Sequence, residues 1–415
     1  MEHSLSLVDH LRHAARSRPQ ALALIHGNQS LNYAELLTAV ETAPSAASSC
    51  TGSSLDIAFA AYACSAQGKP LAPLPPGQGT KEIPPTPANT ALLISTSGSE
   101  GAPRQVVLGM AQLDTAAIAA NAFLALAEGD LWLNCLPLYH IGGLSILWRC
   151  ARAGATLLLH EGFTVEKVAN DLASYPVTHL SLVPAMLSRL LDGGTSPPPS
   201  LKAVLIGGAA LSRPLYERAT AAGWPLFISY GMSETSAMVA AFRPDEGPWR
   251  EGLVGRPMPG HDIRIGDDGR IRIRGPQVMT GYLDGSGIDA EAWLTTGDLG
   301  EVDTDGRLMV LGRADDMLIS GGRNVHPQEI ESCLSSCMGV LDVAVTGLPD
   351  PVWGDLVIAL VVGTADADTL HAHARRTLPS AARPRRIVHL ERLPRNAAGK
   401  LERAMLRRLA AGVTE

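Results

Sequence analysis

Residues 178–231 decide the fold class, and they read THLSLVPAMLSRLLDGGTSPPPSLKAVLIGGAALSRPLYERATAAGWPLFISYG. Three short apolar runs, THLSLV, AVLIGG and LFISYG, alternate in this stretch with segments of helical character. Earlier runs extend the alternation back to residue 91, and they read ALLIS, LWLNCL and ATLLLH. Short apolar strands that alternate with helices are typical of parallel α/β layering. We therefore predict an α/β fold from residue 91 to about residue 240.

The pattern on either side of this layer differs. The first 90 residues combine an amphipathic helix, a strand-like ALALIHG run and loops rich in Ser, Pro and Gly. From 253 to 311 apolar and polar residues alternate across Asp-Gly turns, which predicts antiparallel hairpins. A compact α+β segment follows GRADD. We predict a large N-terminal domain (1–312) of layered α/β subdomains plus a β-hairpin-rich subdomain, a hinge (313–316) and a small α+β C-terminal domain (317–415).

Composition narrows the class of partner. The 415 residues are 46% hydrophobic, which suffices for buried cores and excludes disorder over most of the chain. A net charge of −7 offers no bulk attraction for nucleic acid or anionic lipid, so we expect neither as a partner. The chain shows no secretory signal and no run of membrane-spanning length, and its six cysteines lack a CxxC spacing. We expect a cytoplasmic protein, without membrane insertion, that acts on a small molecule.

A Ser/Gly-rich segment, ISTSGSEGAPR at residues 94–104, directly follows an apolar strand. Hydroxyls and glycine amides at this density can donate hydrogen bonds to a polyphosphate, and glycine lets the backbone approach phosphates closely. The segment lacks the spacing of a Walker-type loop. A flexible loop without a binding role is the alternative. We predict that phosphates contact Ser95, Thr96, Ser97, Gly98, Ser99 and Arg104.

Five further segments follow this loop in order: LPLYHIGG (136–143), YGMSET (230–235), TGD (296–298), GRADD with SGGRNVHPQEIE (312–331), and PRNAAGKLER (394–403). With these segments the chain resembles the adenylate-forming superfamily of acyl-CoA synthetases, peptide-synthetase adenylation domains and luciferases. The resemblance implies that the small C-terminal domain is mobile and that two half-reactions use different domain orientations. It also implies ATP, Mg²⁺ and coenzyme A as cofactors.

The resemblance assigns residues around the nucleotide. Glu234 follows a strand through a tight glycine turn, and a carboxylate beside phosphates is a natural Mg²⁺ ligand, so we expect it to bind the metal and to be catalytic. Asp298 can accept hydrogen bonds from both ribose hydroxyls, and Arg313 can donate to the same sugar. Arg104 stands where many members have lysine and keeps the positive charge. The predicted ATP-binding set is completed by Gly207, Gly208, Tyr230, Gly231 and Thr235.

Lys400 is the predicted catalytic cation. Adenylation needs a positive charge where a carboxylate attacks the α-phosphate, and an ammonium on a flexible stem can be delivered by a moving domain. Only five of the 34 basic residues are lysines, yet the position that the resemblance makes catalytic is one of them. The resemblance places the hinge at Asp315. Contacts to CoA or phosphate are predicted for Ser320, Gly321, Gly322 and Arg323.

The acid substrate is predicted to lie near His140, Gly142 and Gly143. His140 ends the LPLYH run, and α/β enzymes bind ligands at the carboxyl ends of strands. The stretch LWLNCLPLYHIGGLSILWRCARAGATLLL is similar to that of the 2-succinylbenzoate:CoA ligases of menaquinone synthesis. Such an acid keeps a second carboxylate, and Arg149 is our candidate for its cationic partner. The alternative places Arg149 at the helix surface.

We therefore expect an ATP-dependent acid:CoA ligase that acts through an acyl-adenylate, and the resemblance implies 2-succinylbenzoate, in menaquinone biosynthesis, as its acid. A ligase for another aryl acid, benzoate-like or anthranilate-like, or one that loads a carrier protein, stays open as an alternative. An inactive nucleotide-binding regulator is the alternative from another class, and the presence of Glu234, Asp298 and Lys400 argues against it. The sequence leaves the oligomeric state open, a homodimer included.

Overall fold

The computed structural model describes residues 4–44, 46–80, 82–96, 104–396 and 399–412. Within these residues a 13-stranded sheet has the order β14-β15-β17-β18-β13-β12-β11-β10-β9-β7-β8-β1-β2. Six neighbouring strands form its parallel centre: β11 (Leu226–Met232), β10 (Ala203–Ile206), β9 (His179–Leu182), β7 (Leu131–Asn134), β8 (Thr156–Leu159) and β1 (Leu22–His26). The predicted parallel α/β layer is confirmed.

The ALLIS run is an exception, and its placement in the parallel layer was wrong. It lies in β5 (Thr90–Ser95), which pairs antiparallel with β6 (Gln105–Gly109). These two strands form a separate sheet with β16 (Gly281–Tyr282). Only residues 96–104 separate β5 from β6, and a parallel pair needs a crossover of about a dozen residues or more. Ser95 and Gln105, at either end of this connection, are therefore paired antiparallel.

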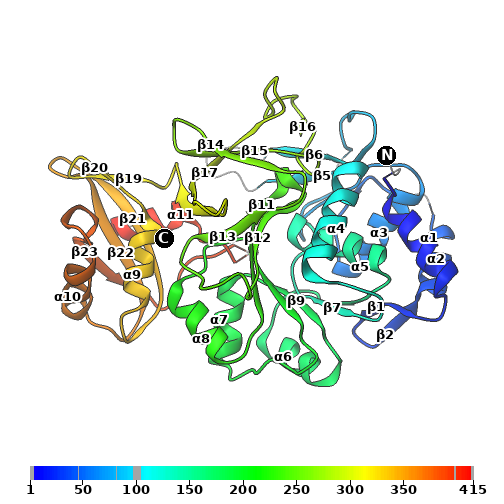
Figure 1. The fold of residues 1–415 in the computed structure, drawn as a ribbon, viewed down its shortest axis with the longest axis horizontal. Coiled ribbons are helices and arrows are strands. Elements are labelled where there is room, and N and C mark those ends of the chain that lie inside the picture. The colour runs from blue at the N-terminus through cyan, green and yellow to red at the C-terminus, as the bar shows by residue number, and fades with distance from the viewer. Residues whose placement is uncertain (1–3, 45, 81, 97–103, 397–398, 413–415) are drawn as a thin grey trace.

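Helices cover both faces of the parallel centre. The chain runs outward from β7 through α5 (Ile141–Ala153) to β8, and then back through α6 (Val165–Ser174) to β9 and onward to β11. Because such crossovers are right-handed, this reversal puts α5 and α6 on opposite faces, as Figure 1 shows. The carboxyl ends of β7 and β9 thus form a switch point, where open α/β sheets bind ligands.

The remaining helices extend these two layers. The helices α1 and α4 contact α5, while α7 contacts α6 and α8. Their bounds are α1 (Leu7–Ser17), α2 (Tyr33–Glu41), α3 (Ser54–Ala66), α4 (Met110–Leu124), α7 (Pro184–Asp192) and α8 (Arg213–Ala221). Short strands accompany the N-terminal helices, namely β2 (Gln29–Asn32), β3 (Ser49–Cys50) and β4 (Ala72–Pro73).

Antiparallel strands continue the large sheet beyond β11. The two predicted hairpins are confirmed, with turns in which Gly269 and Gly306 have φ of +75° and +74°. A positive φ favours glycine, which explains why glycine is the second residue of each Asp-Gly pair. The strands are β12 (Ala237–Phe242), β13 (Leu253–Pro257), β14 (Asp262–Ile265), β15 (Arg270–Arg274), β17 (Leu294–Val302) and β18 (Leu308–Arg313), and the 3₁₀ turn η1 (Ser233–Thr235) precedes β12.

The C-terminal part builds a second sheet with its own cores. Figure 1 shows it at one end of the molecule, next to α7 and α8. Buried residues of the first core end at Leu308, and those of the next begin at Leu318, so the predicted hinge falls between them. Its elements are β19 (Leu318–Ser320), β20 (Arg323–Val325), α9 (Pro327–Ser335), β21 (Val340–Asp350), β22 (Gly354–Gly363), α10 (Ala367–Thr377), η2 (Ser380–Ala382), β23 (Arg386–His389) and α11 (Arg403–Ala411). In the described part of the chain, no helix is both long and apolar enough to cross a membrane.

Candidate active site

Neighbouring strand ends bring several predicted residues to one edge of the sheet. His140 lies shortly after β7, Gly207 and Gly208 follow β10, and Tyr230 lies near the end of β11. Parallel strands that neighbour one another end at the same edge, so these residues face the same side of the sheet. The strand β9 lies between β7 and β10, and Val183 follows it.

Tyr230, Asp298 and Arg313 form a direct network. The Tyr230 hydroxyl donates to Oδ2 of Asp298 at 2.7 Å, and a guanidinium nitrogen of Arg313 lies 3.7 Å from Oδ1. Asp298 and Arg313 are also paired across β17 and β18. Burial and then the Asp298 carboxylate raise the pKa of Tyr230 well above its usual value, so its hydroxyl stays a donor. The three predicted ATP-binding side chains are thus brought together.

The glycines near this network have tight surroundings. A Cβ on Gly207 would lie 2.9 Å from Oγ of Ser229, and Gly208 has a φ of +78°. A Cβ on Gly231 would lie 1.8 Å from the carbonyl oxygen of Ala237, so the β11–β12 turn itself requires glycine there. Packing therefore explains Gly231, while a contact of these glycines with adenine stays a prediction.

Thr235 lies inside the turn that carries Glu234. Its side chain is fully buried, and its hydroxyl donates to the Ala237 carbonyl at 2.8 Å and accepts from the Met232 amide at 3.0 Å. The hydroxyl is therefore occupied by the backbone. The structure gives Thr235 a role in shaping the turn, and its contact with phosphate stays a prediction.

Glu234 has a partner that the sequence did not predict. The Tyr282 hydroxyl donates to its Oε1 at 2.8 Å, and the Glu234 carbonyl accepts from the Met279 amide at 2.8 Å. Arg104 lies over the Tyr282 ring, with Cζ 3.5 Å from the ring centroid. Nothing in the spacing of residues 104, 234 and 282 links them, because only the pairing of β16 with β6 brings Tyr282 to this place.

The residues around Glu234 fit a magnesium ion. Among the described residues, no three His, Cys, Asp or Glu side chains are grouped so that they could hold a metal, so Glu234 belongs to no such cluster. Mg²⁺ keeps several water ligands and binds through one or two carboxylates plus substrate phosphates. A site with few carboxylates beside the predicted phosphate loop suits this ion better than it suits zinc or calcium.

The two ends of the Ser/Gly-rich loop are held together. The Thr96 amide donates to the Arg104 carbonyl at 2.8 Å, and the Thr96 hydroxyl donates to the same oxygen at 3.2 Å. Ser95 ends β5 and pairs with Gln105. The predicted phosphate ligands Ser97, Gly98 and Ser99 lie outside the described residues.

Lys400 lies in a turn of the C-terminal domain that reaches the switch point. The turn is held by hydrogen bonds from the Asn396 amide to the Lys400 carbonyl at 2.9 Å and from the Lys400 amide to Asn396 Oδ1 at 3.1 Å. A Cβ on Gly399 would lie 2.8 Å from Val183, so the turn contacts the end of β9. Burial, followed by the positive charge of Lys400, lowers the pKa of His140 to about 4. The two predicted residues therefore lie close enough to interact electrostatically.

The start of α5 is packed tightly behind His140. A Cβ on Gly143 would lie 2.5 Å from the Pro137 carbonyl oxygen, whereas one on Gly142 would meet Leu136 at an ordinary 3.8 Å. Asn134 donates to the Gly143 carbonyl at 3.0 Å and fixes this approach. Gly143 is thus required by packing, and contact of either glycine with the acid stays a prediction.

Arg149 is not placed beside His140. It lies in α5, and the helical rise of 1.5 Å per residue carries its backbone about 14 Å along the helix from His140. Arg149 is 2% exposed and lies over Trp132, with Cζ 5.4 Å from the ring centroid, so the alternative of a surface arginine is wrong. Burial lowers its pKa to about 10, and no described carboxylate lies within ion-pair distance.

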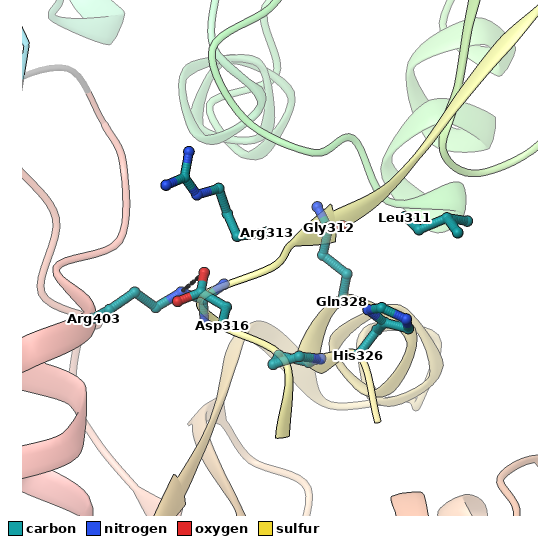
Figure 2. A pocket seen from close by; sticks show the side chains of 8 residues that line it. Leu311, Gly312, Arg313, Asp316, His326, Gln328 and Arg403 are labelled. Carbon is teal, nitrogen blue, oxygen red and sulfur yellow. Dashed lines mark ion pairs between the residues drawn. The ribbon is translucent and has the colours of Figure 1, made fainter. Parts of the chain in front are cut away.

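The predicted hinge is held by ion pairs around a small cavity. Arg313 contacts Asp315 at 2.7 Å, and Arg403 contacts Asp316 at 3.1 Å, as Figure 2 shows for the latter pair. The cavity has a volume of about 40 Å³ and is also lined by His326 and Gln328. This space suits water rather than an acid or a nucleotide.

The SGGR segment forms the tip of a hairpin. Ser320 pairs with Arg323, and the turn residues Gly321 and Gly322 have φ of +55° and +74°. Two central residues with positive φ match a two-residue hairpin turn that favours glycine. Ser320 is buried and Arg323 is exposed, so the turn explains the glycines, while contact with CoA or phosphate stays a prediction.

Comparison with known proteins agrees with this arrangement. The chain matches the family model for AMP-binding enzymes over residues 46–283 and that for the AMP-binding enzyme C-terminal domain over 329–400. It is 36% identical over 329 residues to a 2-succinylbenzoate–CoA ligase of Listeria monocytogenes, covering 77% of this chain and 70% of that protein.

Two solved structures of the o-succinylbenzoate CoA synthetase MenE from Bacillus subtilis are similar throughout. The complex with the acyl-adenylate intermediate OSB-AMP has a TM-score of 0.82 at 29% identity, covering 96% of this chain and 97% of that one. The complex with ATP and magnesium has a TM-score of 0.82 at 28% identity, covering 96% and 99%. The matched family model spans more than half of the chain, and the chain therefore belongs to the AMP-binding enzyme family.

Proposed function

We propose that this chain is an AMP-forming acid:CoA ligase that activates 2-succinylbenzoate in menaquinone biosynthesis. In the first half-reaction, a carboxylate of the acid attacks the α-phosphate of ATP, which gives an acyl-adenylate and releases pyrophosphate. In the second, the thiol of CoA attacks the acyl carbon, which gives the thioester and releases AMP. The names of the relatives support both the acid and these cosubstrates.

The position of the Lys400 turn is the observation that carries this proposal. The turn of the C-terminal domain contacts Val183, and the charge of Lys400 lowers the pKa of His140, at the edge where Tyr230 also lies. A cation there would stabilise the negative charge that builds on the phosphate oxygens as the carboxylate attacks. Mg²⁺, held by Glu234, would neutralise further phosphate charge. Asp298 would hold the ribose.

The acid pocket is proposed to begin at His140. With a pKa of about 4 this imidazole is neutral near pH 7, so it cannot pair as a cation with the second carboxylate. Arg149 is our proposed partner, because it is a buried cation without a described carboxylate beside it. Long side chains on a helix point back toward its N-terminus, which here is the end at His140.

We propose residues 313–316 as the hinge between domains 1–312 and 317–415. Rotation there would carry the Lys400 turn away and bring the hairpin tip with Arg323 toward CoA. The contact of Arg313 with Asp315 would have to rearrange during this motion.

Exchange of labelled pyrophosphate into ATP with a panel of acids tests the proposal. We expect 2-succinylbenzoate to support exchange with the highest kcat/KM, and added CoA to give its thioester. A preference for benzoate or anthranilate would move the assignment to another aryl acid. Thioester formation on a carrier protein but not on CoA would indicate a loading enzyme. ATP binding without exchange for any acid would indicate an inactive regulator.

We also propose that the enzyme works in the cytoplasm. All six cysteines are free thiols, which suits a reducing compartment that supplies ATP and CoA. Fractionation of cells with an antibody to the chain would locate it. Analytical ultracentrifugation would decide between a monomer and a homodimer.

A further inference from the structure

Tyr282 joins two residues of the proposed ATP and Mg²⁺ site that are far apart in the sequence. Its hydroxyl donates to Oε1 of Glu234 at 2.8 Å, and its ring lies 3.5 Å beneath Cζ of Arg104. Glu234 is the proposed metal ligand, and Arg104 ends the proposed phosphate loop. The Tyr282 side chain thus contacts both the proposed metal ligand and the last residue of the proposed phosphate loop.

The backbone holds the Tyr282 side chain in this place. Tyr282 pairs with Val106 on β6, and its amide donates to the Ser286 carbonyl at 2.9 Å. A Cβ on Gly287 would lie 2.5 Å from the ring, and Gly287 has a φ of +100°, so glycine makes room for the ring. Strand pairing and the following turn therefore fix the ring between Glu234 and Arg104.

The same turn also holds Arg104. Its guanidinium donates to Ser286 and lies 3.5 Å from Asp284. A guanidinium stacked on an aromatic ring and bonded at its edge has a restricted orientation. The segment that contains Tyr282 thus sets the position of the last residue of the loop.

We infer that Tyr282 is a positioning residue for the metal and the phosphates. Its hydroxyl fixes the rotation of the Glu234 carboxylate, and the remaining carboxylate lone pairs stay available for Mg²⁺. Its ring holds Arg104 toward the pyrophosphate end of the nucleotide. Hydrogen bonds that orient metal ligands commonly govern metal affinity. This inference rests on the proposed function of the site as an ATP–Mg²⁺ site.

Binding of α,β-methylene ATP, measured by calorimetry with Mg²⁺ and with EDTA, tests the hydroxyl without turnover. Tyr282→Phe keeps the ring and removes the hydroxyl. We expect it to reduce the gain in affinity that Mg²⁺ gives by about 10-fold and to leave the Kd in EDTA unchanged. Tyr175→Phe, at the end of α6 and remote from the site, is the matched control and should match the wild type.

A double variant separates positioning of Glu234 from a general effect. In a Glu234→Gln background, Tyr282→Phe should cause no further loss of the Mg²⁺ gain, because the carboxylate that it orients is gone. Full additivity of the two losses would overturn the inference. So would an equal loss of affinity in Mg²⁺ and in EDTA for the single Phe variant.

Removal of the ring tests the second half of the inference. Tyr282→Leu should weaken binding of pyrophosphate alone, whereas Tyr282→Phe should not, because only the ring contacts Arg104. Equal pyrophosphate affinity in all three proteins would overturn this half. A melting curve of each variant confirms that it is folded. These measurements read nucleotide and pyrophosphate binding, so they are independent of which acid the enzyme activates.

Discussion

The proposed nucleotide side and the proposed acid side of the switch point are built differently. On the nucleotide side the predicted side chains contact one another: Tyr230 contacts Asp298, and Asp298 contacts Arg313. On the acid side His140 and Arg149 lie about 14 Å apart along α5. The first side is a network of direct contacts between side chains, while we propose that the second is completed by the acid. Variants should therefore separate into those that affect ATP and those that affect the acid.

The largest effect is expected for Lys400→Ala, because we propose that Lys400 acts where the acid meets the nucleotide. Loss of one positive charge at the developing phosphate charge should lower the rate of acyl-adenylate formation by about 10² to 10³-fold. Thioester formation from supplied acyl-adenylate should be far less affected. Lys167→Ala, an exposed lysine on α6, is the control. Near wild-type adenylation by the Lys400 variant would remove this residue from the catalytic step.

Asp298→Ala should act on the nucleotide side alone. It removes the acceptor for Tyr230 and the proposed acceptor for the ribose. Hydrogen bonds to a charged group typically contribute about 1.5–3 kcal/mol, so the KM for ATP should rise about 10 to 100-fold. The KM for the acid should stay within about twofold of the wild type. Glu301→Ala on the same strand is the matched control, since Glu301 is exposed. A comparable rise in the KM for the acid would show that the two sides are not separate.

The same difference explains how much could be predicted from the sequence. The order of apolar runs predicted the parallel centre, and the Asp-Gly pairs predicted the hairpins, because both depend on local pattern. The prediction that the ALLIS run lies in the parallel layer was wrong, because the length of the following loop decides which strand it pairs with. The role of Tyr282 was missed because its contacts depend on pairing between distant segments. Arg149 was judged from its neighbours in sequence, and its burial against Trp132 depends on how α5 packs on the sheet.

Arg149→Gln tests the acid side. If Arg149 pairs with the second carboxylate, the KM for 2-succinylbenzoate should rise about 10-fold, while the KM for ATP stays nearly unchanged. Benzoate, which lacks the second carboxylate, serves as the control substrate, and its KM should not change. A loss of thermal stability without a change in the KM for the acid would assign Arg149 to the core beside Trp132 instead.

The smallest effect is expected in the pH dependence of stability. It depends on His140 in the N-terminal part of the chain and on Lys400 in the C-terminal part. Burial and then the charge of Lys400 lower the pKa of His140 from 6.5 to about 4 in the folded protein. Between these two values the unfolded chain binds a proton at His140 and the folded chain does not. The contribution of His140 to the free energy of unfolding is therefore complete above pH 6.5 and is lost as the pH falls toward 4. The melting temperature of His140→Asn, which lacks this titration, should therefore fall less steeply over that range, whereas His13→Asn at an exposed position should follow the wild type. Parallel curves of melting temperature against pH for the wild type and His140→Asn would contradict the lowered pKa of His140. Lys400→Ala removes the nearby positive charge and should raise this pKa, so the loss of stability should end at a higher pH than in the wild type.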